Sequence, residues 1–248
     1  MTLTGARRGS GPALVLLHAL GTDHRMWDPV VDRLVSEREV IALDMPGFGG
    51  SPANHDASPP GLAAAVHGHL AAAGIRDYNV AGNSLGGWVA LELAAAGHAR
   101  SVTAIAPAGL WARALGPRRS AARTGARLIL PFARPLLRSE RGRRLVLATS
   151  ATHPERIPPA AARRLVRAYA TAPGFDAANA AMRSSRFTRL GAIRVPVTLA
   201  WPDGDRLVGR PRVLPPGVRS VVLRGCGHLP TWDDPEQVAG VLLAGSTR

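Results

Sequence analysis

Short apolar segments alternate with helical segments along this chain, and that alternation restricts the possible folds more than any other feature. Apolar runs at residues 13–18, 39–44, 77–82, 101–106, 195–200 and 219–223 are typical of buried parallel strands. Helical patterns occupy residues 27–36, 58–73, 85–96 and 234–243. A strand–helix order of this kind predicts an open α/β fold with a mostly parallel sheet flanked by helices.

The alternation is interrupted between the fourth and fifth predicted strands. We expect residues 107–190 to form a helical insertion, and residues 1–106 and 191–248 to form the core around it. Helical segments are predicted at 118–138, 139–149, 158–170 and 176–187, with prolines that favour several short helices over a long one. The residues expected on their packed faces are Leu128, Leu136, Leu145, Leu165 and Met182.

Length and composition exclude several classes of protein. A chain of 248 residues with 46% hydrophobic residues can bury the core of one domain. No apolar run approaches the roughly 20 residues that span a bilayer, and the first twelve residues lack the apolar core of a signal peptide. A single cysteine, Cys226, cannot form an internal disulfide and has no neighbouring metal-ligand cluster. We therefore expect a cytoplasmic protein without a structural metal.

The charge is strongly positive and unevenly distributed. All 31 basic residues are arginine, and the net charge is +14. The total absence of lysine is best explained by codon bias, because a functional need for guanidinium groups would affect only some positions. Residues 107–190 hold 17 arginines against Glu140, Glu155 and Asp176. These arginines indicate either an anionic substrate or a solvated helical surface. Few aromatic residues accompany them, so specific nucleic-acid binding is not favoured.

One short motif carries a mechanism. The sequence GNSLGG at residues 82–87 fits G-x-S-x-G, directly after a predicted strand and at the start of a predicted helix. The glycines allow a tight turn that exposes the hydroxyl of Ser84 above the sheet. Ser84 is therefore the candidate nucleophile.

A serine nucleophile needs a base, and the base needs an acid to orient it. Among eight histidines, His228 follows the last predicted strand, whereas His18 ends the first strand and is better suited to orienting the next loop. Asp203 and Asp205 both follow the strand at 195–200, and the spacing alone leaves both open. Asp44 also ends a strand, where we expect it to hold the following loop.

Five segments in this order resemble the motifs of the α/β-hydrolase family with a helical cap. They are HALG at 18–21, DMPGFGGS at 44–51, GNSLGG at 82–87, WPDGDRLV at 201–208 and GCGHLPTWDDPEQV at 225–238. The resemblance implies that Asp205 is the acid and that the backbone N–H groups of Leu20 and Leu85 form the oxyanion hole. Ala19 stands where the family has glycine. The family commonly opens with two further strands, and the residues before position 13 allow at most a stub of that hairpin.

The resemblance implies a serine hydrolase that cleaves a carboxylic ester or lactone through an acyl-enzyme, with no cofactor or metal. The substrate would be a small molecule, either neutral or anionic. Dehalogenases and epoxide hydrolases of this fold would need an aspartate at position 84. Residues 20–29 also resemble a loop of enol-lactone hydrolases. A non-hydrolytic ligand-binding protein, an acyltransferase and a perhydrolase remain open alternatives. The oligomeric state is not predicted.

Overall fold

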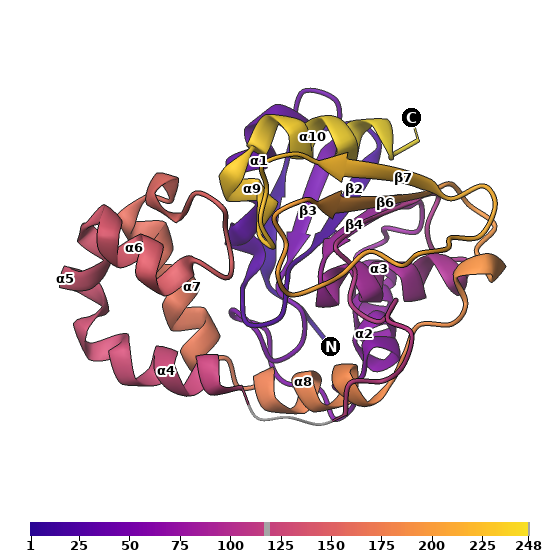
Figure 1. Cartoon of the computed structure of the whole chain (residues 1–248). Helices are drawn as coiled ribbons and strands as arrows, with labels where there is room; N and C mark the ends of the chain where they lie inside the picture. The colour runs from indigo at the N-terminus through magenta and orange to yellow at the C-terminus, as the bar shows by residue number, and fades with distance from the viewer. Residues whose placement is uncertain (117–119, 248) are drawn as a thin grey trace.

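A seven-stranded sheet forms the centre of the structure, a computed structural model that describes residues 1–116 and 120–247 (Figure 1). The strand order is β1-β3-β2-β4-β5-β6-β7, and every pairing is parallel except that of β1 with β3. The strands are β1 (Gly5–Arg8), β2 (Ala13–Leu17), β3 (Glu39–Leu43), β4 (Tyr78–Asn83), β5 (Val102–Ile105), β6 (Val197–Pro202) and β7 (Arg219–Leu223). The predicted mostly parallel sheet is confirmed.

Helices cover both faces of the sheet, as predicted (Figure 1). One face packs against η1 (His24–Trp27), α1 (Asp28–Leu34), α9 (Pro230–Asp233) and α10 (Pro235–Ala244), and the other against α2 (Pro59–Ala72) and α3 (Leu85–Ala95). Strand β2 explains the unbroken apolar runs: Leu14 and Leu16 join one core cluster, and Val15 and Leu17 join the other. Within the described part of the chain, no helix combines the length and apolar character needed to cross a membrane.

Strand β1 was not assigned from the sequence. Its four residues, GARR, are all exposed, and it pairs at the edge of the sheet with β3. A strand of this kind carries no apolar alternation, so its register is determined by backbone pairing, together with the ion pair of Arg7 with Glu39 of β3. It corresponds to the stub that the sequence allowed before position 13.

Among the described residues between β5 and β6, the α-helices are α4 (Ala121–Ile129), α5 (Ala133–Arg138), α6 (Glu140–Leu147), α7 (Pro159–Thr171) and α8 (Phe175–Ser184). Helices α4 to α7 form a lobe beside the sheet, and α8 lies close to α2 (Figure 1). The helix predicted at 118–138 is interrupted by the 3-10 turn η2 (Leu130–Phe132), which contains Pro131. Residues 118 and 119 of that prediction lie outside the described residues.

The packed faces predicted for α4 and α6 are partly wrong. Leu128 and Leu145 are 71% and 77% exposed, whereas Arg123 and Arg143 are buried. Arg123 donates hydrogen bonds to the carbonyls of Ala170 and Ala172 at the end of α7. The ends of short helices leave carbonyls without partners, and a guanidinium with five donors satisfies several of them at once. Arginine side chains therefore occupy the packed faces of these helices, where we expected the leucine side chains.

Candidate active site

Ser84 lies at the turn between β4 and α3. Its φ of 57° is in the left-handed region, which residues other than glycine rarely adopt. The backbone N–H of Ser84 donates to the Ile105 carbonyl at 2.9 Å, and the Ser84 carbonyl accepts from Ala108 at 3.0 Å. A non-glycine residue in this conformation costs roughly 1–3 kcal/mol, so the surrounding structure must hold it. The turn places the Ser84 side chain at the carboxyl end of the sheet.

The glycines of the motif are required because the backbone of the turn closely approaches the backbones of α3 and β2. A Cβ added to Gly82 would lie 2.1 Å from the Gly86 carbonyl oxygen. A Cβ on Gly86 would lie 2.3 Å from the Leu17 carbonyl oxygen in β2. Neither backbone can move without disturbing the sheet or α3, so the turn closes only with glycine at both positions.

His228 and Asp205 come together on two loops at the same edge of the sheet. His228 Nδ1 lies 2.8 Å from Asp205 Oδ2, and both side chains are buried, at 8% and 2% exposed. The other Asp205 oxygen accepts from the backbone N–H groups of Leu207 and Val208, at 2.7 and 3.2 Å. Burial raises the pKa of the Asp205 carboxyl, but these hydrogen bonds and His228 outweigh it, so the pKa is lowered. Asp203, the alternative acid, is exposed on the same loop.

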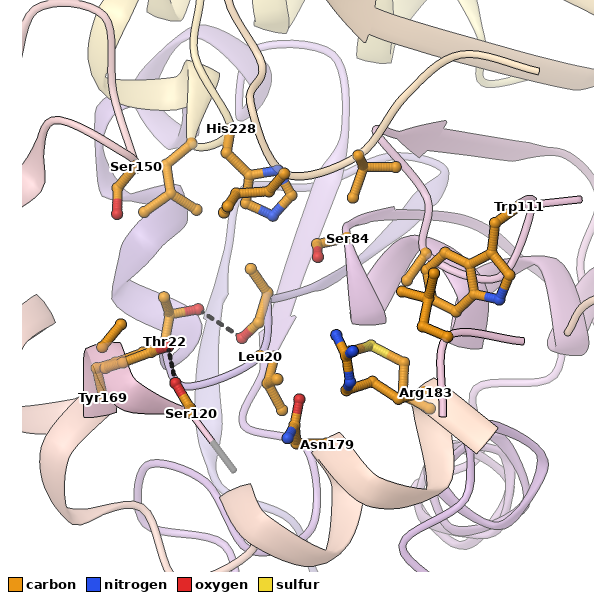
Figure 2. A pocket seen from close by; sticks show the side chains of 18 of the residues that line it. Leu20, Thr22, Ser84, Trp111, Ser120, Ser150, Tyr169, Asn179, Arg183 and His228 are labelled. Atoms are coloured by element: carbon orange, nitrogen blue, oxygen red, sulfur yellow. Dashed lines mark hydrogen bonds between the residues drawn. The ribbon is translucent and has the colours of Figure 1, made fainter. Parts of the chain in front are cut away.

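Because Nδ1 of His228 is engaged with Asp205, Nε2 is the ring nitrogen left for the cavity. Ser84 and His228 line the same cavity, of about 390 Å³, and Figure 2 shows both facing its interior. The loops after β2 and β5 contribute Leu20 and Ala108 to the wall, and the inserted helices contribute Tyr169, Met182 and Arg183, among others. Most of the wall is apolar.

The loop after β2 holds Leu20 at the cavity. Met45 N–H donates to His18 Nε2 at 2.9 Å, so Nδ1 carries the proton and donates to the Ala19 carbonyl at 2.8 Å. Burial lowers the pKa of His18, which favours this neutral form. Thr22 closes the turn by donating its hydroxyl to the Ala19 carbonyl at 2.8 Å (Figure 2).

Alanine at position 19 is compatible with this turn. Ala19 is not among the described residues with positive φ, and its N–H donates to the Met26 sulfur at 3.2 Å. Gly21 has the positive φ instead, and a Cβ there would lie 2.5 Å from the Tyr169 ring. The glycine that this loop needs is therefore Gly21. Leu85, the other residue predicted at the oxyanion site, is the first residue of α3, so its N–H has no acceptor within that helix.

Asp233 is a site residue that the sequence did not single out. Its buried carboxylate accepts from Gly227 N–H, beside His228, at 2.7 Å. It also accepts from Thr152 and His153 N–H at 3.0 and 2.7 Å. Asp233 thus joins the His228 loop to the inserted helices. Its only signal was its place five residues after His228, within the DDPE segment.

Asp44 holds its loop, as expected. Burial raises the pKa of Asp44, but hydrogen bonds from His24, Gly50 and Thr4 outweigh it and hold the pKa well below its usual range. Asp23, His24 and Asp44 bring three potential metal-ligand atoms within 4.8 Å of one another. The Asp23 carboxylate is already paired with Arg25 at 2.7 Å, however, and Asp44 is filled by its donors. Hydrogen bonding accounts for this cluster.

Comparisons with known proteins agree with this fold. The profile of the alpha/beta hydrolase family matches residues 14–241. A solved membrane phospholipase A is 27% identical, with a TM-score of 0.75 over 98% of this chain and 85% of that one. The enol-lactonase from Burkholderia xenovorans shares the fold at 22% identity, with a TM-score of 0.76 over 98% of this chain and 95% of that one.

Curated relatives match over shorter stretches. The putative carbamate hydrolase RutD of Escherichia coli is 34% identical over 115 residues, which are 46% of this chain and 43% of RutD. The bifunctional biotin-biosynthesis protein BioHC of Cellvibrio japonicus is 40% identical over 84 residues, 34% of this chain and 16% of BioHC. The matches thus span less than half of these relatives. The family profile, in contrast, covers nearly the whole chain, which therefore belongs to the alpha/beta hydrolase family.

Proposed function

We propose that this protein is a serine hydrolase that cleaves a carboxylic ester or lactone through an acyl-enzyme. The observation that carries the proposal is the shared cavity. Ser84 lines it from a strained turn. His228 also lines it, and its Nδ1, on the side of the ring away from the cavity, is held by the buried carboxylate of Asp205. A nucleophile, a base and an orienting acid are the minimum that acyl transfer to serine requires.

In the proposed reaction, His228 Nε2 removes the proton from the Ser84 hydroxyl as its oxygen attacks the substrate carbonyl. Asp205 stabilises the imidazolium that forms and keeps Nδ1 protonated. The alcohol then leaves with the proton from His228, and the acyl group stays on Ser84. Water, deprotonated by His228, attacks this ester. The bond between the acyl group and Ser84 then breaks, the acid is released, and His228 returns the proton to the Ser84 hydroxyl. We assign the backbone N–H groups of Leu20 and Leu85 to the oxyanion hole, where they stabilise the negative oxygen of both tetrahedral intermediates.

We also propose that residues 107–190 act as a cap on a core formed by residues 1–106 and 191–248. Tyr169, Met182 and Arg183 of the inserted helices line the cavity opposite Ser84. The volume of about 390 Å³ and the apolar wall suit a small acyl ester or lactone.

Arg183 favours a substrate that carries a negative charge. Among the described residues that line the cavity, it is the one arginine, and Figure 2 shows its guanidinium pointing inward. Arg183 Nε donates to the Gly116 carbonyl at 2.9 Å, which leaves the two terminal nitrogens for a ligand. No ion pair joins Arg183 to an acid in the described residues. A guanidinium with two nitrogens free suits a carboxylate of the substrate.

The first experiment is a burst and turnover assay with short p-nitrophenyl esters on the wild type and on Ser84→Ala. A fluorophosphonate probe read by mass spectrometry identifies the labelled residue. We expect labelling at Ser84 and loss of turnover in Ser84→Ala. Absence of both labelling and turnover would contradict the proposal and favour a ligand-binding protein. Adding an alcohol, a peroxide or a p-nitrophenyl carbamate to the same assay distinguishes hydrolysis of esters from acyl transfer, perhydrolysis and carbamate cleavage.

The anion hypothesis has its own test. Arg183→Gln is compared with Arg141→Gln, an exposed arginine of α6, on esters with and without a distal carboxylate. We expect Arg183→Gln to lower kcat/KM about 10-fold to 100-fold for the carboxylated ester alone, the value of a charged hydrogen bond. Equal effects on both esters would remove Arg183 as an anion site while leaving the serine mechanism intact.

A further inference from the structure

The inserted helices carry a second cavity on their outer surface, away from Ser84. It is an open groove of about 690 Å³, and we name it the arginine groove for the five side chains that line it: Arg127, Arg134, Arg163, Arg164 and Arg167. Leu130 and Pro131 form part of its apolar floor. None of its described lining residues is acidic.

Helical spacing explains how the arginines gather. Arg163, Arg164 and Arg167 share one face of α7, because residues three and four apart are neighbours on a helix. The opposite face of α7 is buried by Ala162, Leu165 and other apolar side chains. Arg127 and Arg134 approach from α4 and α5, which both pack against α7.

This positive charge is poorly neutralised within the protein. Arg127 lies 3.9 Å from Asp176, and Arg164 lies 3.6 Å from Asp28. Arg134, Arg163 and Arg167 form no ion pair with any described residue. Like charges repel at this spacing, so the groove is a favourable place for an external anion. Codon bias explains arginine in place of lysine, but it does not explain this clustering.

Two large apolar side chains that are adjacent in sequence to residues of the arginine groove are exposed. Leu128 is 71% exposed and directly follows Arg127, and Phe132 is 67% exposed and directly follows Pro131. Exposed apolar groups next to basic ones are typical of surfaces that bind lipid headgroups and insert side chains below them. A nucleic-acid site would instead favour several aromatic side chains for stacking.

We propose that the arginine groove binds the surface of a bilayer that contains anionic phospholipids. The arginines contact the headgroup phosphates, and Leu128 and Phe132 insert among the acyl chains. Helices α4 and α7 also line the Ser84 cavity, through Ala122 and Tyr169. Docking would therefore place the cavity at a defined position relative to the bilayer. This surface does not depend on the proposed hydrolase activity, and its test measures binding alone.

The test is vesicle flotation with phosphatidylcholine alone and with about 30% phosphatidylglycerol added, at increasing salt. The groove variant is Arg134→Gln/Arg163→Gln/Arg167→Gln. The control, Arg76→Gln/Arg210→Gln/Arg212→Gln, removes equal charge from exposed arginines outside the groove. We expect the wild type and the control to bind only the anionic vesicles, and the groove variant to bind them about 100-fold more weakly, from about fivefold for each of the three arginines.

A second variant, Leu128→Ser/Phe132→Ser, tests insertion. We expect it to bind at low salt but to dissociate at salt concentrations that the wild type survives, because screening weakens charge contacts and not apolar ones. Thermal melting checks that each variant is folded. The proposal is overturned if the wild type ignores anionic vesicles, or if the control loses as much binding as the groove variant. It is also overturned if an oligonucleotide or a soluble inositol polyphosphate binds through these arginines while vesicles do not.

Discussion

The sheet core and the inserted helices solve the problem of burial in different ways. In the core, strands such as β2 bury apolar side chains on both faces, and Leu16, Leu17 and Val15 are fully buried. In the insertion, Arg123 and Arg143 are buried while Leu128 and Leu145 are exposed. The rule that holds in β2, where every leucine is buried, therefore fails for Leu128 and Leu145 of the insertion.

The difference shows which force orients a helix in each setting. A helix on a broad sheet has a continuous apolar surface to cover, so hydrophobic burial determines its rotation. The short inserted helices pack around α7 and leave several carbonyl ends to satisfy. Arg143 donates to the carbonyls of Leu137, Arg138 and Glu155, at 3.0, 2.9 and 2.8 Å. There, hydrogen bonding to helix ends determines which face is inside.

The largest expected effect is on kcat/KM, which a substitution in the core should lower and a substitution in the insertion should not. We expect Asp205→Asn, in the core, to lower kcat/KM on a p-nitrophenyl ester by about 10⁴-fold, because the amide no longer stabilises the imidazolium or its tautomer. Asp203→Asn, on the same loop, and Glu155→Gln, in the insertion, serve as controls and should stay within about 3-fold of the wild type. Comparable losses in the controls would show that the assay reports folding instead of catalysis.

The next effect compares two leucines in urea unfolding. We expect Leu91→Ala, fully buried in α3, to lower the free energy of unfolding by about 2–5 kcal/mol through the cavity it leaves. Leu128→Ala, in α4, should change it by less than about 0.5 kcal/mol. A large loss at Leu128 would mean that the side chain is covered in solution.

Two neighbouring arginines in α6 sharpen the comparison within the insertion. We expect Arg143→Met to lower the free energy of unfolding by about 2–3 kcal/mol, since three carbonyls lose a charged donor. Arg144→Met removes exposed ion pairs with Glu140 and Glu155 and should cost under about 1 kcal/mol. Equal effects would indicate that the buried arginine is not a structural element of the insertion.

The smallest effect is on how the free energy of unfolding depends on pH. The pKa of Asp44 is lower in the folded protein than in the unfolded chain, so its stabilisation is complete above the unfolded value near 4 and is lost as the pH falls below it. We expect Asp44→Asn to be less stable by about 1–2 kcal/mol at pH 7, and to lose less stability between about pH 5 and pH 3. Glu140→Gln, at an exposed carboxylate of the insertion, should follow the wild type. Chemical denaturation at each pH gives the comparison, and an unchanged slope for Asp44→Asn would refute it.

Much of the core could be predicted because its signals are local. Each parallel strand is an apolar run, and the Gly82 and Gly86 spacing marks the turn at Ser84 through close backbone contact. The pairing of His228 with Asp205 also followed from motif order, although choosing Asp205 over Asp203 required the family resemblance. Strand β1 and the contacts of Asp233 had no such signal, because backbone pairing and hydrogen bonds between distant loops leave no periodic pattern.

The sequence by itself determined the alternation of strands and helices along the chain, the turn at Ser84 and the excess of arginine in the insertion. These features depend on periodicity and composition, which are properties of neighbouring residues. Only the tertiary structure decided where those arginines lie. Arg123 and Arg143 are buried at helix ends, Arg183 faces the Ser84 cavity, and Arg163 and Arg167 line the outer groove. The physical reason is that a guanidinium can satisfy carbonyls, bind an anion or face water, and the surroundings that select one of these come from distant parts of the chain.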